Sequence, residues 1–227
     1  MAANPALIPG DRLDKDDFYK VIEEYTREDA KREDIIKKSR DVLKLSKQAI
    51  FALHRKDEAA ANAHLESCFS VIEKDLFPIT EEHPTLRLTG MLVAALEEYA
   101  EARIFLHFLK TRKLLPFKSL NGLRVEEFLG GLMDCTGELN RFAVLRATEH
   151  DATAVHDCCQ FVGTVHEQMI LLDLRNSPLR RKYDSLKYTQ KRLEALVYEL
   201  AVAARMQNIK LPSMLMEPEP ETNANQE

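Results

Sequence analysis

Hydrophobic positions recur every three to four residues along most of the chain, a spacing that predicts amphipathic helices. No stretch alternates apolar and polar residues over a useful length, so we expect no sheet. Prolines and turn residues divide the pattern into six predicted helices, over residues 13–55 with a break near Arg27, 57–76 ending before Pro78, 84–115, 125–148, 152–174 and 179–206. The fold class predicted is all-α, an antiparallel bundle of about six to seven helices.

The two ends of the chain lack this pattern. We expect residues 1–10 to form a flexible N-terminal arm and residues 11–210 a single helical domain. Residues 211–227 are acidic, contain proline and have little to bury, which predicts a disordered tail.

Composition narrows the class of protein. The 227 residues are 45% hydrophobic and carry a formal net charge of −5, so nucleic-acid binding would need a local basic patch. The four cysteines show no metal-binding spacing and fall inside predicted helices, as expected of reduced thiols in the cytoplasm or nucleus. Neither a signal peptide nor a membrane-spanning run is predicted, so we expect an intracellular, soluble protein with no membrane partner.

Four acidic residues occupy positions at which two predicted helices should bury apolar side chains. Glu98 and Glu101 are spaced i, i+3 in one helix, and Asp134 and Glu138 are spaced i, i+4 in the next. A carboxylate in an apolar environment is costly unless it is paired, protonated or bound to a cation. Mg²⁺, or Mn²⁺, prefers oxygen ligands of this kind, and one of the glutamates could serve as general base.

The four acids are also compatible with a purely structural role. Pairs at i, i+3 or i, i+4 are frequent on solvated helices, and the acids could simply form interhelical salt bridges. Spacing excludes two metal sites of a different kind. A di-iron bundle site requires Glu-x-x-His, which the chain lacks, and the fragment HEQMI at residues 166–170 lacks the second histidine of a zinc protease helix. No phosphate-binding glycine loop or serine nucleophile motif occurs.

The densest basic stretch begins just before the last predicted helix, continues into it and contains two tyrosines. It is either a surface for single-stranded RNA, with phosphate contacts and base stacking, or a solvated face or partner interface. Its members are Arg175, Arg180, Arg181, Lys182, Tyr183, Lys187, Tyr188, Lys191 and Arg192.

Four segments resemble the translin family, in family order. SRDVLKLSKQAIFALHR (residues 39–55) resembles the first long helix of the family, and LRRKYDSLKYTQKRLEALVYEL (179–200) resembles the last. EEYAEARIFLHFLKTRKLL (97–115) and GLMDCTGELNR (131–141) resemble the signature helices of one branch, translin-associated factor X or TRAX. The segment HPTLRLTG (83–90) departs from the histidine-rich relatives and leaves Arg87 as an RNA-contact candidate there.

The resemblance implies a function. TRAX is the catalytic subunit of a hetero-octameric translin–TRAX endoribonuclease that cuts single-stranded RNA with Mg²⁺. By resemblance, Glu98 and Glu101 match the acids of the EYxEA stretch and Asp134 and Glu138 those of the DxTGE stretch, as metal ligands and catalytic residues. Translin itself lacks this acidic set.

The expected activity is therefore metal-dependent phosphodiester hydrolysis of RNA, within a hetero-oligomer with translin subunits. Expected substrates are small-RNA passenger fragments, as in RNA interference, or tRNA precursors. RNA contacts are expected at Arg87, Arg180, Arg181, Lys187 and Arg192. Two other functions stay open, a non-catalytic nucleic-acid-binding or scaffolding subunit and a helical adaptor.

Overall fold

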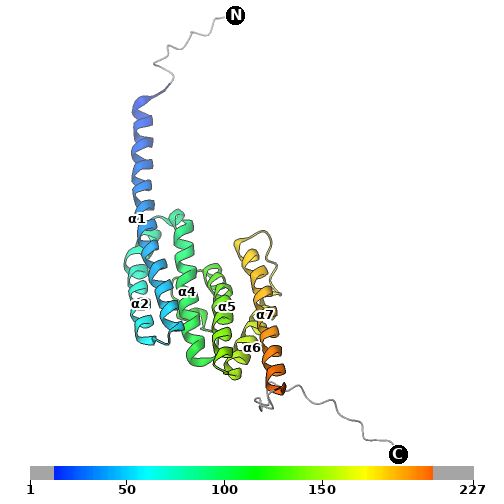
Figure 1. The fold of residues 1–227 in the computed structure, drawn as a ribbon. Helices are drawn as coiled ribbons and strands as arrows, with labels where there is room; N and C mark the ends of the chain where they lie inside the picture. The colour runs from blue at the N-terminus through cyan, green and yellow to red at the C-terminus, as the bar shows by residue number, and fades with distance from the viewer. Residues whose placement is uncertain (1–12, 207–227) are drawn as a thin grey trace, which may run out of the picture.

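A computed structural model describes residues 13–206, and within that range the chain is helical without strands. The predicted all-α bundle is confirmed (Figure 1). The helices are α1 Lys15–His54, α2 Glu58–Val71, α3 Phe77–Glu82, α4 Gly90–Thr111, α5 Val125–Thr148, α6 Ala152–Met169 and α7 Pro178–Met206. The predicted arm at residues 1–10 and tail at 211–227 lie outside the described residues. Over residues 13–206, no helix combines the length and apolarity that crossing a membrane requires.

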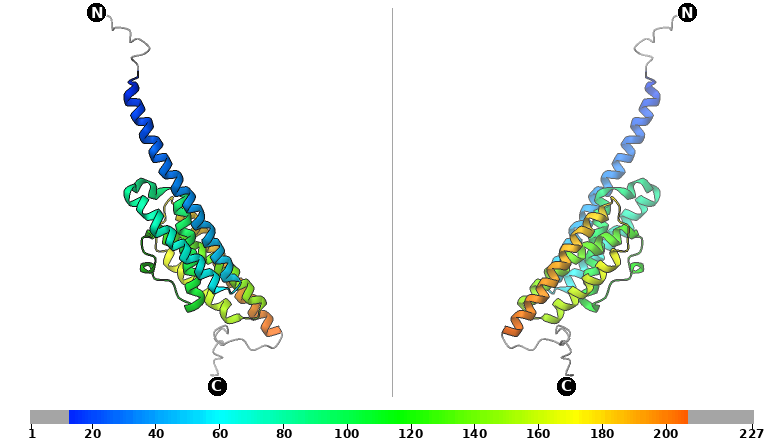
Figure 2. Two further views of the ribbon diagram at one scale, coloured as in Figure 1. Left: turned by 90° about the vertical axis from the view of Figure 1, so that its left-hand side faces the viewer. Right: turned by 90° about the vertical axis from the view of Figure 1, so that its right-hand side faces the viewer.

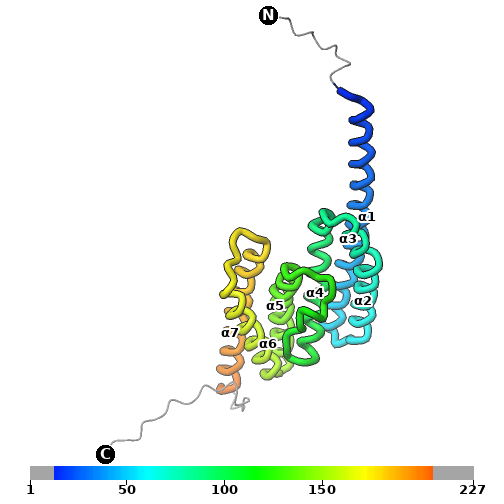
Figure 3. The backbone as a smooth tube through the Cα atoms, turned by 180° about the vertical axis from the view of Figure 1, so that it is seen from behind, coloured from blue at the N-terminus to red at the C-terminus, as the bar shows by residue number. Residues whose placement is uncertain are grey.

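The long helices lie side by side in the order α2, α1, α4, α5 and α7, and α6 packs against both α5 and α7 (Figures 1 and 3). Helices α1 and α2 run antiparallel, as do α6 and its two neighbours, whereas α4 and α5 run in the same direction (Figure 1). The connection between α4 and α5 permits this, because it carries the chain back along the bundle (Figure 3). Contacts among α1, α4, α5 and α7 therefore join residues at the same level of the bundle.

Helix α1 is continuous over 40 residues, so the predicted break near Arg27 is wrong. The segment contains neither glycine nor proline, and its many Glu, Lys and Arg residues are good helix formers. Its second half packs in the bundle and buries Ile35, Val42 and Ala49. Its first half projects beyond the other helices (Figure 2).

The predicted stop before Pro78 is also wrong. The chain passes through a π-helical turn at Ile72–Leu76 directly into α3, with Pro78 in the first turn of α3. Proline is tolerated at that position because its missing N–H would have no partner within α3. The residues from Pro84 to Leu88 then form a 3₁₀ turn, so α4 begins later than predicted, at Gly90.

Helix α5 has the predicted bounds. Its start is fixed by Glu127, whose carboxylate accepts a hydrogen bond of 2.9 Å from the backbone N–H of Arg124. Because α4 lies in the middle of the row, it is buried on most sides. Its residues Leu96, Phe105 and Phe108 are fully buried in the core of the bundle. Polar side chains on the α4 face toward α5 therefore lie close to a well-packed apolar core.

Candidate functional site

The predicted acidic residues lie where α4 and α5 approach closely. A Cβ added at Gly131 of α5 would be 2.5 Å from the backbone oxygen of Glu97 and 2.8 Å from the backbone nitrogen of Glu101. Only glycine permits this separation. A glycine inside a helix costs about 1 kcal/mol relative to alanine. That cost is offset here by backbone contact between the two helices that carry the acids.

Burial and mutual repulsion define the electrostatics of this cluster. Glu101 is 7% exposed. Burial first, and then the charges of Glu98, Asp134 and Glu138, raise the pKa of Glu101 to about 9. Burial likewise raises the pKa of Glu98, and the charge of Lys47 on α1 opposes that rise. The structure therefore brings the four sequence-predicted acids within electrostatic reach of one another, with Glu101 neutral at physiological pH.

Glu138 has the opposite protonation tendency because of His54, the last residue of α1. The Nε2 atom of His54 lies 2.5 Å from Oε2 of Glu138, and its ring packs against Phe105 with 5.0 Å between centroids. This hydrogen bond lowers the pKa of Glu138, and the opposing effect of burial is smaller. One glutamate in the cluster is thus held ionised and another neutral, an arrangement suited to distinct acid–base roles.

Lys182 of α7 closes the cluster on its other side. Its ammonium donates to the Asp134 carboxylate and, at 3.0 Å, to Oε2 of Glu97. Burial lowers the pKa of Lys182, but the hydrogen bonds and charges of these two acids outweigh burial and raise it overall. Lys182 therefore differs from the rest of the basic stretch in the last helix, because its charge is directed at the acids between the helices. Glu97 also borders the cluster.

The donor set fits a hard cation in its chemistry. Glu101 is a buried acid surrounded by three others, and a divalent ion is the ordinary means of stabilising such a group in its charged form. Asp134 and Glu138 each have a second carboxylate oxygen beyond the one bound to Lys182 or His54. Across residues 13–206, no three His, Cys, Asp or Glu side chains are already gathered around one point, so binding would require these side chains to turn toward one another.

The predicted RNA contacts are not gathered into one surface. Arg87 donates to both carboxylate oxygens of Glu127, which is 2% exposed, and therefore ties the segment before α4 to the start of α5. Arg180 and Lys187 both pair with Asp184 on α7 itself, at 3.5 Å each. The remaining two, Arg181 and Arg192, are exposed.

The contacts of Lys182 and His54 with the acids were not predicted, although the sequence contains a signal for each. Lys182 is spaced i+3 from Leu179 and i−4 from the buried Leu186, so it stands on the apolar stripe of α7. His54 follows Ile50 by four residues on the buried side of α1. A charged or polar residue on a buried stripe usually has a specific partner.

These features define a class of protein, an all-α bundle in which side chains from four helices enclose a cluster of carboxylates. The sequence matches the Translin family over residues 30–204, and the chain belongs to that family. The resemblance to the family stated from the sequence is thereby confirmed.

Individual members of the family are also similar to this chain in sequence. The chain is 25% identical to Translin-associated protein X of Pongo abelii over 212 residues, covering 76% of this chain and 73% of that protein. It is 35% identical to Translin of Gallus gallus over 80 residues, which are 35% of either chain. The matched segment therefore spans about a third of the length of the translins.

Solved structures share the fold. The crystal structure of apo-NeC3PO superposes with a TM-score of 0.72 at 20% identity, covering 88% of this chain and 100% of that one. A complex of AfC3PO with duplex RNA has a TM-score of 0.70 at 21% identity, covering 84% of this chain and 98% of that one.

Proposed function

We propose that this chain is the catalytic subunit of a Mg²⁺-dependent endoribonuclease that hydrolyses single-stranded RNA, such as small-RNA passenger fragments or tRNA precursors, within a hetero-oligomer with translin subunits. The observation that carries the proposal is the buried Glu101 among three further acids at the α4–α5 contact. A subunit with a purely structural role would gain no stability from this arrangement, because a buried acid surrounded by like charges lowers the free energy of unfolding once it is ionised.

The residues that would hold the cation are Glu98, Glu101, Asp134 and Glu138. Such an ion neutralises charge at a phosphate and lowers the pKa of a bound water when present. Glu138, ionised and held in place by His54, is positioned to accept a proton from the attacking water. Water adds to phosphorus and one P–O ester bond breaks, and the departing oxygen takes up a proton. The ammonium of Lys182, beside Asp134, can stabilise negative charge on the phosphate oxygens.

The projecting half of α1 supports assembly with a partner. It carries an apolar stripe at helical spacing, Phe18, Ile22 and Tyr25, of which Tyr25 is 64% exposed. An aromatic stripe on a helix that extends beyond its own bundle is typical of a subunit contact. In this proposal the partner covers that stripe, and RNA reaches the acids inside the assembled complex.

Cleavage of labelled single-stranded RNA tests the proposal, using the full-length chain with and without a translin subunit. We expect cutting in Mg²⁺ that stops on addition of a chelator and is lost in Glu101→Gln and in Asp134→Asn. The matched control is Glu126→Gln, an exposed acid at the start of α5. Undiminished cutting by both site variants would refute the assignment of the acids.

A second function, a nucleic-acid-binding subunit without catalysis, is favoured by one observation. Asp134 and Glu138 already have the cationic or hydrogen-bonding partners Lys182 and His54, which could replace a metal ion in holding them. Binding of RNA by the complete assembly without cutting at any Mg²⁺ concentration would establish this alternative.

A further inference from the structure

The exposed face of α1 beside the acids carries a stripe of cations that the proposed site does not use. We propose that this stripe, Arg40, Lys44, Lys47 and Arg55 together with Phe51, binds single-stranded RNA and leads it to the acidic cluster. The inference rests on the proposed function and specifies where the substrate lies.

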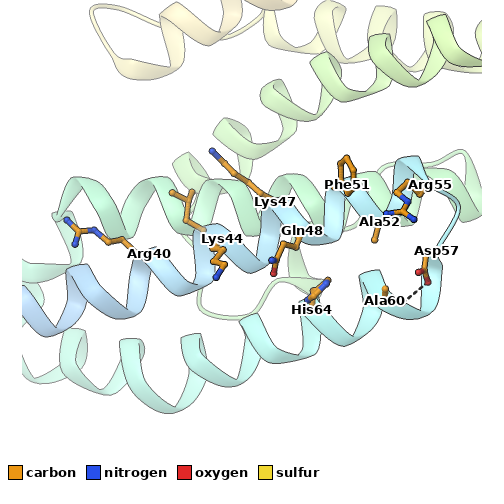
Figure 4. A pocket seen from close by; sticks show the side chains of 11 residues that line it. Arg40, Lys44, Lys47, Gln48, Phe51, Ala52, Arg55, Asp57, Ala60 and His64 are labelled. Carbon is orange, nitrogen blue, oxygen red and sulfur yellow. Dashed lines mark hydrogen bonds between the residues drawn. The ribbon is translucent and has the colours of Figure 1, made fainter.

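Helical geometry places these side chains on one face. At about 100° per residue, Arg40, Lys44, Lys47, Phe51 and Arg55 fall within an arc of roughly 80°. In Figure 4 the side chain of Lys44 extends toward α2, whereas those of Lys47 and Phe51 extend away from it. The stripe covers four turns, about 22 Å at 1.5 Å per residue, which is long enough for several nucleotides.

The charges of this stripe are not neutralised within the described part of the chain. None of the four cations forms an ion pair with an acid of residues 13–206, whereas Arg87, Lys110 and Arg146 all do. Asp57 is the acid that lines the same groove, and its carboxylate caps α2 by accepting a 3.0 Å hydrogen bond from the backbone of Ala60 (Figure 4). In a chain of net charge −5, four unpaired cations on one helix face form a local site for an anion.

The groove beneath the stripe suits a nucleotide base as well as a phosphate. It lies between α1 and α2 and encloses about 770 Å³, with His64 of α2 on its far side. Phe51 is 54% exposed, although burial of such a ring would be favourable, and the Arg55 guanidinium lies 5.7 Å from its centroid. An exposed ring flanked by cations is the arrangement with which proteins stack bases of single strands without sequence preference.

Lys47 connects this surface to the acids. Its side chain points away from α2 (Figure 4), and its ammonium lies within electrostatic reach of Glu98 on α4. A strand held along α1 would therefore pass Lys47 next to Glu98, where its phosphates meet the carboxylate cluster. An acidic face of a partner protein could also bind the cations, and subunit assembly of the cation variant tests that alternative.

The test measures binding of fluorescent oligouridine to the full-length chain and to its assembly with a translin subunit, in EDTA, over a range of salt concentrations. For Arg40→Gln/Lys44→Gln we expect the slope of log K against log salt to become shallower by about 1.4, which corresponds to roughly 20-fold weaker binding near 0.1 M salt. The matched control, Lys113→Gln/Lys118→Gln, removes the same charge from exposed positions in the connection after α4 and should bind like the wild type.

The ring has its own pair of variants. Phe51→Leu keeps an apolar side chain and should weaken binding by about fivefold or more, whereas Phe51→Trp keeps a stacking surface and should preserve it. If the cation variant binds with an unchanged slope while the wild type cuts RNA, the stripe is refuted and the proposed nuclease stands. If the wild type binds but never cuts, and the cation variant binds weakly, the stripe stands without the nuclease. Loss of subunit assembly in the cation variant, with RNA affinity unchanged, would identify the face as a protein interface and overturn the inference.

Discussion

His54 at the end of α1 is hydrogen-bonded to Glu138 on α5, although 84 residues separate them along the chain. The contact joins the first long helix to the acidic cluster across α4, and it lowers the pKa of Glu138.

Replacing His54 by phenylalanine removes this hydrogen bond and keeps an aromatic contact with Phe105. At neutral pH we expect a loss of about 1–2 kcal/mol in the free energy of unfolding, measured with urea. Because the pKa of Glu138 is lowered in the folded protein, its stabilising contribution is present above the unfolded pKa and is lost as pH falls through the folded value. The difference between variant and wild type should therefore shrink as the solution is made acidic and disappear once Glu138 is protonated in the folded protein. A deficit that persists unchanged in acid would mean that His54 acts through packing alone.

Lys182→Met should lower stability by on the order of 1–2 kcal/mol, because it leaves Asp134 and Glu97 without their shared cation in a half-buried position. Adding Glu97→Gln should recover part of this loss, since less negative charge remains to be compensated. The control Lys187→Met removes a lysine from an exposed pair with Asp184 and should change stability by a few tenths of a kcal/mol at most. Equal effects of the two lysine variants would contradict the role assigned to Lys182.

Gly131→Ala tests the close approach of α4 and α5. The added methyl group would meet backbone atoms of α4, which cannot move aside as a flexible side chain would. We expect a loss of about 2 kcal/mol or more, together with reduced RNA cleavage as the acids separate. Gly137→Ala, six residues further along α5, has nothing within 4 Å of the new methyl group and should gain up to about 1 kcal/mol from helix propensity. A Gly131→Ala protein as stable as wild type would show that the helices are farther apart in solution.

Glu101→Gln should change how stability depends on pH. The pKa of Glu101 is raised to about 9 in the folded protein, so without metal its contribution is fully present below the unfolded pKa and is lost progressively as pH rises toward 9. Relative to wild type, Glu101→Gln should gain on the order of 1 kcal/mol per pH unit between about pH 5 and pH 9. Thermal unfolding across this range checks it. Parallel pH profiles of the two proteins would mean that Glu101 is ionised at neutral pH.

The effect of added Mg²⁺ on stability should depend on pH in the opposite direction. A cation bound to Glu101 displaces its proton, so stabilisation of the wild type by Mg²⁺ should increase as pH rises. Glu101→Gln cannot supply that charge and should show little stabilisation at any pH.

Local patterns predicted much of the fold, because helix bounds depend on nearby residues. Helix α5 begins and ends as predicted, and its start depends on a nearby residue, because the side chain of Glu127 caps its own helix. The errors at Pro78 and before Gly90 occurred where a π turn and a 3₁₀ turn take the place of regular helix. Periodicity alone does not distinguish these turns from α-helix.

The four acids could be placed on shared helix faces by spacing, but their partners could not. Lys182 and His54 reach the cluster from α7 and α1, and local sequence carries no information on which helices become neighbours. The parallel packing of α4 against α5 could not be predicted from local sequence either. It depends on the connection that returns the chain and on the contact at Gly131.

The most direct test of the account is the location of a metal ion. Crystals of the full-length chain assembled with a translin subunit, soaked in Mn²⁺, would show the ion by anomalous scattering. If the acids hold the cation, we expect one peak between α4 and α5, at about 2.1 Å from carboxylate oxygens of both Glu101 and Asp134. Absence of a peak there at saturating Mn²⁺, with Lys182 still bound to Asp134, would contradict it.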